Sequence, residues 1–423
     1  MTTIFALSSG APPAAIGIVR ISGTQAGEAL TRLCGALPPE RTASLRTLRD
    51  GAGEVLDRAL VLWFPGPASA TGEDCAEIHC HGGRAVIAAI ERALANMPGL
   101  TAAEPGSFTR RAFTNGRMDL AEAEGLADLL AAETELQRRV AQAQAGGEAS
   151  RQVAEWRDEV LRLSAIIEAL LDFSDEDDVE GVGETFFHDV DRLVEALESW
   201  LARPPAERLR DGVRVVLSGP PNAGKSSLFN RLLASEAAII SPIAGTTRDV
   251  IERPVAIDGV PLVLIDTAGL RSETGDAIEA VGIARAAEQM YSADIVLWLG
   301  EEGAGPEGSI EVETRADLGA HEKANAAVRV SGLTGEGVSD LATLTVEKAR
   351  AILPQPGESA VNARQRLCLR RARDALQDIR HTADILLVGE CLRNARSAFD
   401  DLLGNSSTEH MLDALFGRFC LGK

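Results

Sequence analysis

Apolar and polar positions along the chain fall into successive stretches that predict different structures. Residues 1 to 118 alternate short apolar runs with glycine and proline, a pattern typical of an α+β domain. From residue 119 to 208 apolar residues recur at helical spacing, which predicts long antiparallel helices. The repeats form two stripes, Leu120, Ala123, Ala127 and Leu130, and then Trp156, Val160, Leu163, Ile167 and Leu170.

A different pattern begins after Pro204 and Pro205 and covers residues 209 to 352. Runs that predict buried strands alternate there with helix-compatible stretches, and this alternation favours a parallel α/β sheet. The runs are residues 213–218, 262–265, 295–299 and 328–330. Only about ten residues separate the third run from a further strand near Ile310, fewer than a parallel crossover normally needs. One helix is therefore predicted to be missing, which leaves an irregular sheet edge.

Helical periodicity returns after Pro354 and Pro356, and residues 353 to 423 are predicted to be helical. The simplest architecture is multidomain: an α+β domain, then a discontinuous helical domain into which the α/β domain is inserted. Because the termini of a domain often lie close together, such an insertion is readily accommodated.

Charge limits the ways in which this chain can bind nucleic acid. The formal net charge is −21, so any RNA contact has to be local or delivered by a partner. One basic run stands out, and we interpret it as a solvated helix face, with an RNA- or phosphate-binding patch as the alternative. It consists of Arg364, Arg366, Arg370, Arg371 and Arg373.

Hydropathy and cysteine usage favour a cytoplasmic protein. No apolar run approaches the ~20 residues of a membrane helix, and the first residues lack the pattern of a signal peptide. The six cysteines include no Cys-x-x-Cys pair, which is typical of reduced thiols. The spacing of Cys75, His79, Cys80 and His81 fits no closed four-ligand zinc site.

The strongest chemical signal is a complete GxxxxGK[ST] motif between a predicted strand and a helix-compatible segment. Its glycines let backbone N–H groups surround phosphate oxygens, and the helix N-terminus adds partial positive charge. Lys225 is expected to reach the β- and γ-phosphates, and the Ser226 hydroxyl to ligate Mg²⁺. The predicted nucleotide contacts in this loop are Gly219, Asn222, Ala223, Gly224, Lys225, Ser226 and Ser227.

Two further segments predict that the nucleotide is hydrolysed as in GTPases. Asp266-Thr267-Ala268-Gly269 follows an apolar run, where the carboxylate can hold Mg²⁺ through water and Gly269 can sense the γ-phosphate. In the segment Gly245-Thr246-Thr247, Thr247 is the candidate for completing the Mg²⁺ shell. In this order and spacing the motifs indicate a GTPase.

The base-binding segment departs from the usual GTPase motif. GTPases similar to this chain use Asn-Lys-x-Asp, whose aspartate accepts both guanine N–H groups. Here the segment reads Thr314-Arg315-Ala316-Asp317, followed by Ser331-Gly332-Leu333. Asp317 is retained and the stem of Arg315 can stack on the base, so guanine is predicted with weaker anchoring of the loop.

Segments outside the α/β domain resemble a single family. The chain ends in Phe419-Cys420-Leu421-Gly422-Lys423, which is similar to the C-terminal Cys-x-Gly-Lys of the tRNA-modification GTPase family MnmE, also called TrmE. Residues 77–83 and 103–124 resemble N-terminal signatures of the same family. For Cys420 we favour a packing or site-lining role, with a nucleophilic role as the alternative.

The resemblance implies a fold, an activity and partners. The N-terminal domain would be similar to folate-binding aminomethyltransferase modules, and the inserted domain would be Ras-like. With an FAD-dependent partner, MnmG, in a heterotetramer, the family adds an aminomethyl or carboxymethylaminomethyl group to C5 of the wobble uridine of tRNA. The carbon comes from 5-formyl- or methylene-tetrahydrofolate, and the protein would form a homodimer.

The resemblance also implies site residues. The folate contacts would be Arg20, Glu77, Arg117 and Lys423, although Arg20 and Glu77 taken alone suggest a surface ion pair. A potassium ion would be held by Asn222, Ser241, Ile243 and Thr246. Leu270 stands where Ras-like enzymes place a water-orienting glutamine, so that task would pass to Glu279. An exposed helix glutamate is the alternative interpretation of Glu279, and Arg271 is the local alternative for neutralising charge.

Two other functions remain open at this point. One is a regulatory switch GTPase, for instance in ribosome assembly, with the flanking domains as binding modules. The other is a one-carbon folate binder whose GTPase has decayed. The intact Lys225, Ser226, Thr247 and Asp266 argue against the second.

Overall fold

The computed structural model describes residues 2–172, 182–235, 251–267, 290–319, 323–355, 358–405 and 409–422. The chain divides into two compact units. The first comprises Met1–Ala127 and Asp400–Lys423, and the second comprises Asp128–Phe399. The first and last segments of the chain thus belong to one unit.

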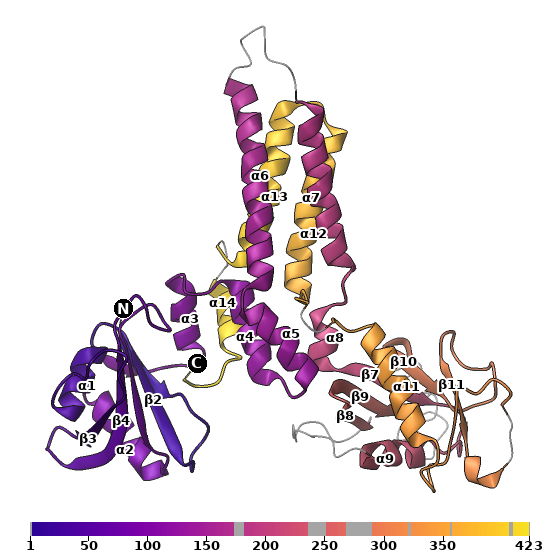
Figure 1. Ribbon diagram of the computed structural model, residues 1–423, viewed down its shortest axis with the longest axis horizontal. Helices are drawn as coiled ribbons and strands as arrows, with labels where there is room; N and C mark the ends of the chain where they lie inside the picture. The colour runs from indigo at the N-terminus through magenta and orange to yellow at the C-terminus, as the bar shows by residue number, and fades with distance from the viewer. Residues whose placement is uncertain are drawn as a thin grey trace, which may run out of the picture. The chain divides into compact units, whose positions relative to one another are not determined.

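A six-stranded mixed sheet forms the centre of the first unit (Figure 1). Its strands, in the order β3-β4-β5-β2-β1-β6, are β3 (Ser44–Arg49), β4 (Val55–Phe64), β5 (Cys75–His81), β2 (Ile16–Ser22), β1 (Thr3–Leu7) and β6 (Leu100–Ala102). Helices α1 (Ala26–Cys34) and α2 (Arg84–Ala95) cover one face and bury its apolar side chains, among them Val19 and Ile78. The predicted α+β arrangement is confirmed.

The opposite face of this sheet is covered only in part. Near β1 it packs against Phe108 of α3 (Ser107–Thr114). Farther out, the cross-strand partners Leu45 and Leu60 are 51% and 44% exposed, and Ile16 on β2 is 57% exposed. Because side chains alternate along a strand, these positions mark an uncovered apolar area, which we call the open sheet face.

The C-terminal segment returns to this first unit. Helix α14 (Glu409–Phe416) buries Leu412 and Phe416 against Leu120 and Ala123 of α4 (Leu120–Ala131). Arg110 of α3 donates hydrogen bonds to Asp413 (2.8 Å) and Glu409 of α14. The end of the chain is therefore held on the N-terminal sheet domain by an apolar cluster and an ion-pair network.

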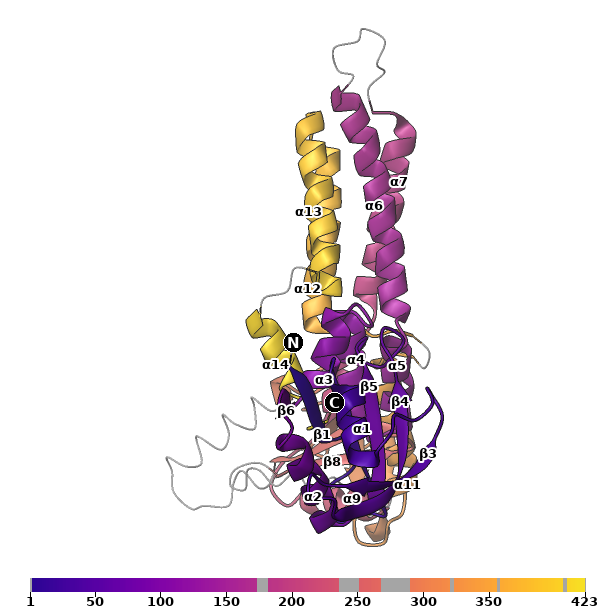
Figure 2. The same ribbon diagram turned by 90° about the vertical axis from the view of Figure 1, so that its left-hand side faces the viewer.

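Long helices make up much of the second unit. The helices α6 (Glu148–Asp172), α7 (Glu184–Ala202), α12 (Ala363–Asp378) and α13 (Ile385–Leu403) lie side by side as a bundle (Figures 1 and 2). Shorter helices are α5 (Glu135–Ala145) and α8 (Ala206–Asp211), and η3 (Ile379–His381) is a single 3₁₀ turn. Trp156 packs against Trp200 and Phe399, with ring centroids 5.2 and 6.2 Å apart.

The helical stripes predicted from the sequence are largely confirmed. In α6, Trp156, Val160, Leu163 and Ile167 are buried. In α4, Leu120 and Ala123 are buried, but Leu130 at the end of the same stripe is 46% exposed.

The α/β sheet of the second unit has six strands in the order β12-β11-β10-β7-β9-β8. They are β7 (Val213–Ser218), β8 (Ile251–Ile257), β9 (Val260–Asp266), β10 (Ile295–Trp298), β11 (Ile310–Thr314) and β12 (Val328–Val330). All neighbours are parallel except β8 and β9. The helices α9 (Lys225–Ser235) and α11 (Val338–Ala351) and the 3₁₀ turn η2 (Ala316–Leu318) complete the described part.

The missing crossover helix is confirmed. β10 and β11 pair in parallel, and residues 299–309 between them contain no helix. Polar contacts hold this connection instead: Glu302 accepts hydrogen bonds from the Ala324 and Asn325 amides, and Lys323 donates to Glu311 (2.5 Å) and to the Trp298 carbonyl (2.9 Å). A buried ion pair thus stabilises the irregular sheet edge.

Candidate functional site

The phosphate-binding loop connects β7 to α9 at the carboxyl end of the parallel strands. Gly219 and Gly224 have φ of +151° and +86°, and Asn222 also has a positive φ of 62°. A Cβ at Gly219 would lie 3.0 Å from the Gly300 amide nitrogen, so this turn requires glycine. Because α9 begins at Lys225, the first N–H groups of the helix have no acceptor in a preceding helical turn, and such a helix start suits an anion.

The side chain of Lys225 folds back over the phosphate-binding loop. Its ammonium group donates to the carbonyls of Gly219 (2.9 Å) and Pro220 (2.7 Å), and the residue is only 6% exposed. A buried ammonium group is costly unless it is hydrogen-bonded or paired. Lys225 is therefore held at the mouth of the phosphate loop, where phosphate oxygens can replace its carbonyl partners.

Two oxygen ligands suited to a divalent cation converge beside this lysine. The Ser226 hydroxyl donates to Asp266 at the end of β9 (2.8 Å), and Asp266 is 2% exposed. Mg²⁺ prefers such hard oxygen ligands and keeps several waters, so the pair fits a magnesium site that is completed by phosphate. The hydroxyl of Thr267, a residue predicted to contact the nucleotide, donates to the Leu217 carbonyl (2.9 Å).

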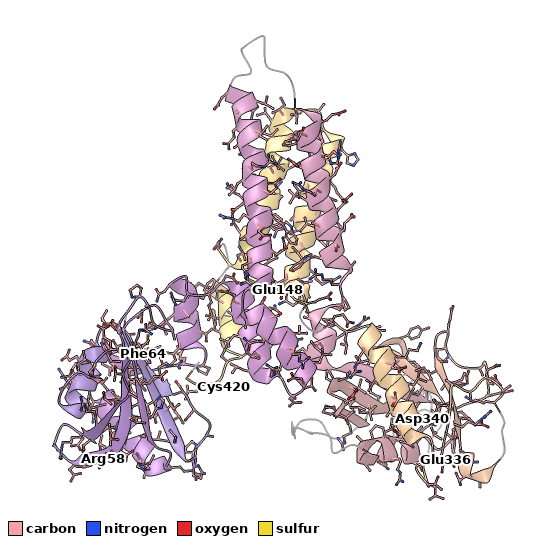
Figure 3. All side chains as sticks on the ribbon, in the orientation of Figure 1. Arg58, Phe64, Glu148, Glu336, Asp340 and Cys420 are labelled. Atoms are coloured by element: carbon pink, nitrogen blue, oxygen red, sulfur yellow. The ribbon has the colours of Figure 1, made fainter. Side chains whose placement is uncertain are left out.

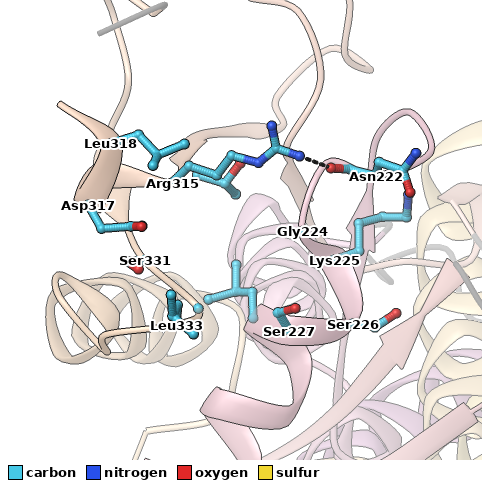
Figure 4. A pocket seen from close by; sticks show the side chains of 13 residues that line it. Asn222, Gly224, Lys225, Ser226, Ser227, Arg315, Asp317, Leu318, Ser331 and Leu333 are labelled. Atoms are coloured by element: carbon cyan, nitrogen blue, oxygen red, sulfur yellow. Dashed lines mark hydrogen bonds between the residues drawn. The ribbon is translucent and has the colours of Figure 1, made fainter. Parts of the chain in front are cut away.

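The base-binding segment faces the phosphate loop across one cavity of about 680 Å³ (Figure 4). Its lining joins residues that lie about a hundred positions apart in the sequence. Those predicted from the motifs are Asn222, Gly224, Lys225, Ser226, Ser227, Thr314, Arg315, Asp317, Ser331, Gly332 and Leu333. The cavity is wide enough for a nucleotide, since small-molecule sites typically measure about 300–1,000 Å³.

Sequence reasoning missed two residues of this lining, Leu228 and Leu318. Leu318 directly follows Asp317, lies in the same 3₁₀ turn and is 68% exposed. With Leu333, which is 82% exposed, it offers apolar surface to the flat face of a base. For Leu318, the signal that the sequence offered was a leucine within an otherwise polar turn.

A second candidate site lies on the sheet of the first unit. Arg20 and Glu77 are direct partners in the β2–β5 register, and both Nε and Nη2 of Arg20 donate to one carboxylate oxygen (3.1 and 2.8 Å). His79 Nε2 contacts the other oxygen (3.2 Å). Burial by itself raises the pKa of Glu77, but the Arg20 charge and the hydrogen bonds from both partners outweigh it and lower that pKa.

The remaining folate candidates and the C-terminal motif lie near this sheet. Arg117 is exposed just after α3, and its side chain lies beside Gly72. Gly422 has a φ of +88°, and a Cβ there would lie 2.1 Å from the Leu7 carbonyl oxygen. Ser8 donates to the Gly422 carbonyl (2.8 Å), so the Cys-x-Gly-Lys motif is anchored at the end of β1.

Comparison with known proteins extends this picture to the whole chain. The model of the MnmE helical domain matches residues 120–420, and that of the GTP-binding protein TrmE N-terminus matches residues 3–117. The tRNA modification GTPase MnmE of Erythrobacter litoralis is 62% identical over 424 residues, which span 100% of both chains. This chain belongs to the MnmE family. The MnmE protein of Novosphingobium aromaticivorans is 56% identical over 100% of this chain and 99% of its own.

A solved structure is also similar to part of the chain. The G domain of the T. maritima FeoB iron transporter is 27% identical over 32% of this chain and 98% of its own, with a TM-score of 0.23. Within the described ranges, the helices are too short or too polar to cross a membrane.

Several residues that the GTPase motifs or the MnmE resemblance mark lie outside the described residues. They are Ser241, Ile243, Thr246, Thr247, Ala268, Gly269, Leu270, Arg271, Glu279 and Lys423. The candidate site that the structure describes is therefore the phosphate loop, the Ser226–Asp266 pair and the base-binding segment.

Two sequence interpretations change with the structure. Arg366 is not a solvated residue: it donates to the Leu201 and Arg203 carbonyls at the end of α7 (2.6 and 2.9 Å), because unpaired carbonyls there need donors. Arg373 is paired with Asp374 (2.5 Å). Cys420, labelled in Figure 3, is exposed and fills no core position. A site-lining role and the alternative nucleophilic role both stay predictions.

Proposed function

We propose that this chain couples GTP hydrolysis to modification of C5 of the wobble uridine in tRNA, acting with an FAD-dependent MnmG-type partner. The observation that carries the GTPase half is the convergence of Lys225, Ser226 and Asp317 on one cavity, with Asp266 hydrogen-bonded to Ser226. Membership of the MnmE family supports the tRNA half. The proposed division of the chain is 1–118, 119–208, 209–352 and 353–423.

Each described residue has a distinct task in this proposal. Backbone N–H groups of residues 222–227 bind the phosphates, and Lys225 moves from loop carbonyls to the β- and γ-phosphate oxygens. Ser226 and Thr247 would hold Mg²⁺, and Asp266 would hold it through water. The ion, when bound, supplies positive charge against the developing negative charge of the phosphates. Asp317 accepts the guanine N–H groups.

A second part of the proposal concerns the attacking water. Leu270 is apolar and cannot orient water, so we assign that task to Glu279, with Arg271 as the alternative source of positive charge. A potassium ion held by Asn222, Ser241, Ile243 and Thr246 would take the place of an arginine finger. The left-handed backbone of Asn222, at the rim of the cavity, supports a special position for that residue.

The folate-binding proposal rests on strand register. Ala6 pairs with Arg20, and Arg20 pairs with Glu77, so three adjacent strands bring these positions together. Gly422 is anchored at Leu7, one residue beyond Ala6, which puts Lys423 next in the chain after that anchor. A 5-formyl- or methylene-tetrahydrofolate would then be bound by Arg20, Glu77, Arg117 and Lys423. Its glutamate tail is negatively charged and would pair with the cationic groups among them.

We further propose a homodimer that meets at the open sheet face, combined with the partner protein in a heterotetramer. Exposed Leu45, Leu60 and Ile16 support this, because large apolar side chains gathered on one face of a monomer often mark an interface. A cytoplasmic location follows from the proposed reaction on tRNA.

Steady-state hydrolysis by the purified chain tests the GTPase proposal. Turnover is measured with GTP and with ATP, in potassium and in sodium buffer. GTP-selective turnover that is faster in potassium supports the site at Asn222. Equal rates in both salts, or equal use of ATP, contradict the mechanism and favour a regulatory switch GTPase. A deletion strain that keeps its 5-modified wobble uridines would contradict the tRNA half.

A further inference from the structure

Positive charge gathers in the helical bundle where α7 ends beside the start of α12 (Figure 1). Arg366 of α12 donates to the Leu201 and Arg203 carbonyls at the end of α7 (2.6 and 2.9 Å). Arg370 follows one helical turn later on the same side of α12, next to Arg366. We call Arg203, Arg366 and Arg370 the arginine cluster.

Two members of the arginine cluster are held in place by the protein itself. Arg366 is fixed by its two bonds to carbonyl groups. The guanidinium group of Arg203 lies over the Trp200 ring, 4.3 Å from its centroid, and Trp200 is only 7% exposed. Because these side chains are already ordered, they lose less conformational entropy when they bind a ligand.

The positive charge of the arginine cluster is only partly balanced within the chain. Burial and the charge of Arg370 both lower the pKa of Arg366, and Glu207 acts in the opposite direction. Glu207 also accepts a hydrogen bond from the Ala363 amide (2.6 Å), so it is shared between two donors. Within the part of the chain that the structure describes, neither Arg203 nor Arg370 forms an ion pair.

Two carboxylates farther along the contact between α7 and α12 already have partners. Gln377 donates to Glu198 of α7 (3.0 Å), and Arg373 pairs with Asp374 (2.5 Å). Arg370 lies between these contacts and the end of α7, and it is exposed. The arginine cluster can therefore pair with an anion from outside the chain.

We propose that the arginine cluster binds the phosphate backbone of tRNA. The inference rests on the proposed function in tRNA modification. Guanidinium groups bind phosphate through parallel hydrogen bonds, and a bound phosphate relieves the repulsion between Arg366 and Arg370. Because the net charge of −21 repels RNA at long range, a local basic site determines where RNA contacts this chain. Arg366 contributes charge, and Arg370 offers exposed donors.

Equilibrium binding of a fluorescently labelled tRNA transcript to the full chain tests this, with anisotropy measured at several potassium chloride concentrations. Arg370→Gln is expected to weaken tRNA binding about fivefold at about 0.1 M salt. It should also make the slope of log affinity against log salt shallower by about 1, as for the loss of one phosphate contact. Arg203→Gln should act in the same direction. Arg370→Lys keeps the charge and is expected to stay within about twofold of the parent chain.

The matched control is Arg396→Gln, because Arg396 of α13 is also exposed but lies outside the arginine cluster. It should leave the tRNA affinity and its salt slope unchanged, and basal GTP hydrolysis should be the same in all variants. A parent chain that does not bind tRNA, parent-like binding by Arg370→Gln, or an equal loss in Arg396→Gln would overturn the inference. Parent-like binding would point to a different partner, such as an acidic protein surface. A parent chain without GTP turnover, or a deletion strain that keeps its 5-modified wobble uridines, would instead refute the proposed function.

Discussion

Single residues of the nucleotide site could be predicted from the sequence because they belong to short contiguous motifs with a known chemical role. The phosphate loop, Asp266 and Asp317 all reach the expected end of the sheet. The bond from Thr314 to Ala223 could not be predicted, since it joins positions 91 residues apart. For the same reason the sequence did not show that Arg366 caps the end of α7.

Asp317 leads to a prediction about base specificity. A carboxylate accepts from both N1–H and N2–H of guanine, whereas an amide can accept from N1–H and donate to the C2 carbonyl of xanthine. Asp317→Asn is therefore expected to prefer XTP over GTP. The expected loss in GTP affinity is about 10²-fold, because the bond from N2–H is lost, its donor faces the amide N–H, and the bond from N1–H no longer has a charged acceptor. Competition binding with both nucleotides measures this. Unchanged GTP affinity would show that Asp317 does not read the base.

Gly422 leads to a prediction about the C-terminal tail. Its left-handed backbone and the 2.1 Å approach of a Cβ to the Leu7 carbonyl leave no room for a side chain. Gly422→Ala is expected to release the tail and to make its last residues a better carboxypeptidase substrate. Gly417→Ala, at a glycine whose φ is not in the left-handed region, is the control. Equal digestion of both variants and the parent would show that the tail is not anchored there.

At the scale of elements, the spacing of segments along the sequence predicted which elements form, but it did not predict the contacts between them. The short gap between β10 and β11 correctly indicated a missing helix. What replaces it, the Lys323–Glu311 pair and the Glu302 contacts, depends on long-range packing that no local pattern contains. The packing of α14 on α3 is long-range as well, because it joins opposite ends of the chain.

The α3–α14 contact predicts the effect of truncating one aromatic ring. Phe416 is 2% exposed and lies 6.0 Å from Phe113 and 6.1 Å from Phe419, centroid to centroid. Phe416→Ala is expected to cost about 3–5 kcal/mol of local stability, because it leaves a cavity in a small cluster. Hydrogen exchange should accelerate in peptides of α3 and α14, and exposed Arg418→Ala should leave it unchanged. Equal protection in Phe416→Ala would mean that α14 does not dock through this ring.

The β2–β5 pair predicts a pH dependence. The pKa of Glu77 is lowered, so the folded state prefers its ionised form. The Arg20–Glu77 pair therefore stabilises the folded state at neutral pH. This stabilisation is lost as the pH falls through the lowered pKa, below 4.5. Arg20→Gln removes the largest of the opposing, pKa-lowering influences. Hydrogen exchange of β2 and β5, compared with the parent at each pH, should be faster at pH 7, and the difference should shrink in acid. A difference that is constant with pH would contradict the pairing.

At the scale of the whole molecule, the order of helices, then an α/β sheet, then helices again could be predicted from where each periodicity stops and resumes. The sequence did not show which face of the N-terminal sheet remains uncovered, because this depends on the strand order. In the register of β3, β4 and β5, Leu45, Leu60 and His79 lie in one row across the sheet. That row continues to Ile18 of β2. The open sheet face therefore spans at least four strands.

The exposed leucines of this face, Leu45 and Leu60, support the last prediction, that the chain dimerises through the open sheet face. A stable interface buries about 800 Å² per partner, and a charge placed at its centre cannot be desolvated without a partner. The double substitution Leu45→Arg and Leu60→Arg is expected to convert a dimer of 44.7 kDa chains into monomers, measured by sedimentation equilibrium. Leu386→Arg, at a 64% exposed leucine of α13, is the matched control and should remain dimeric. Because all three positions are exposed, folding should change by less than about 0.5 kcal/mol. A double variant that stays dimeric would place the interface on another surface.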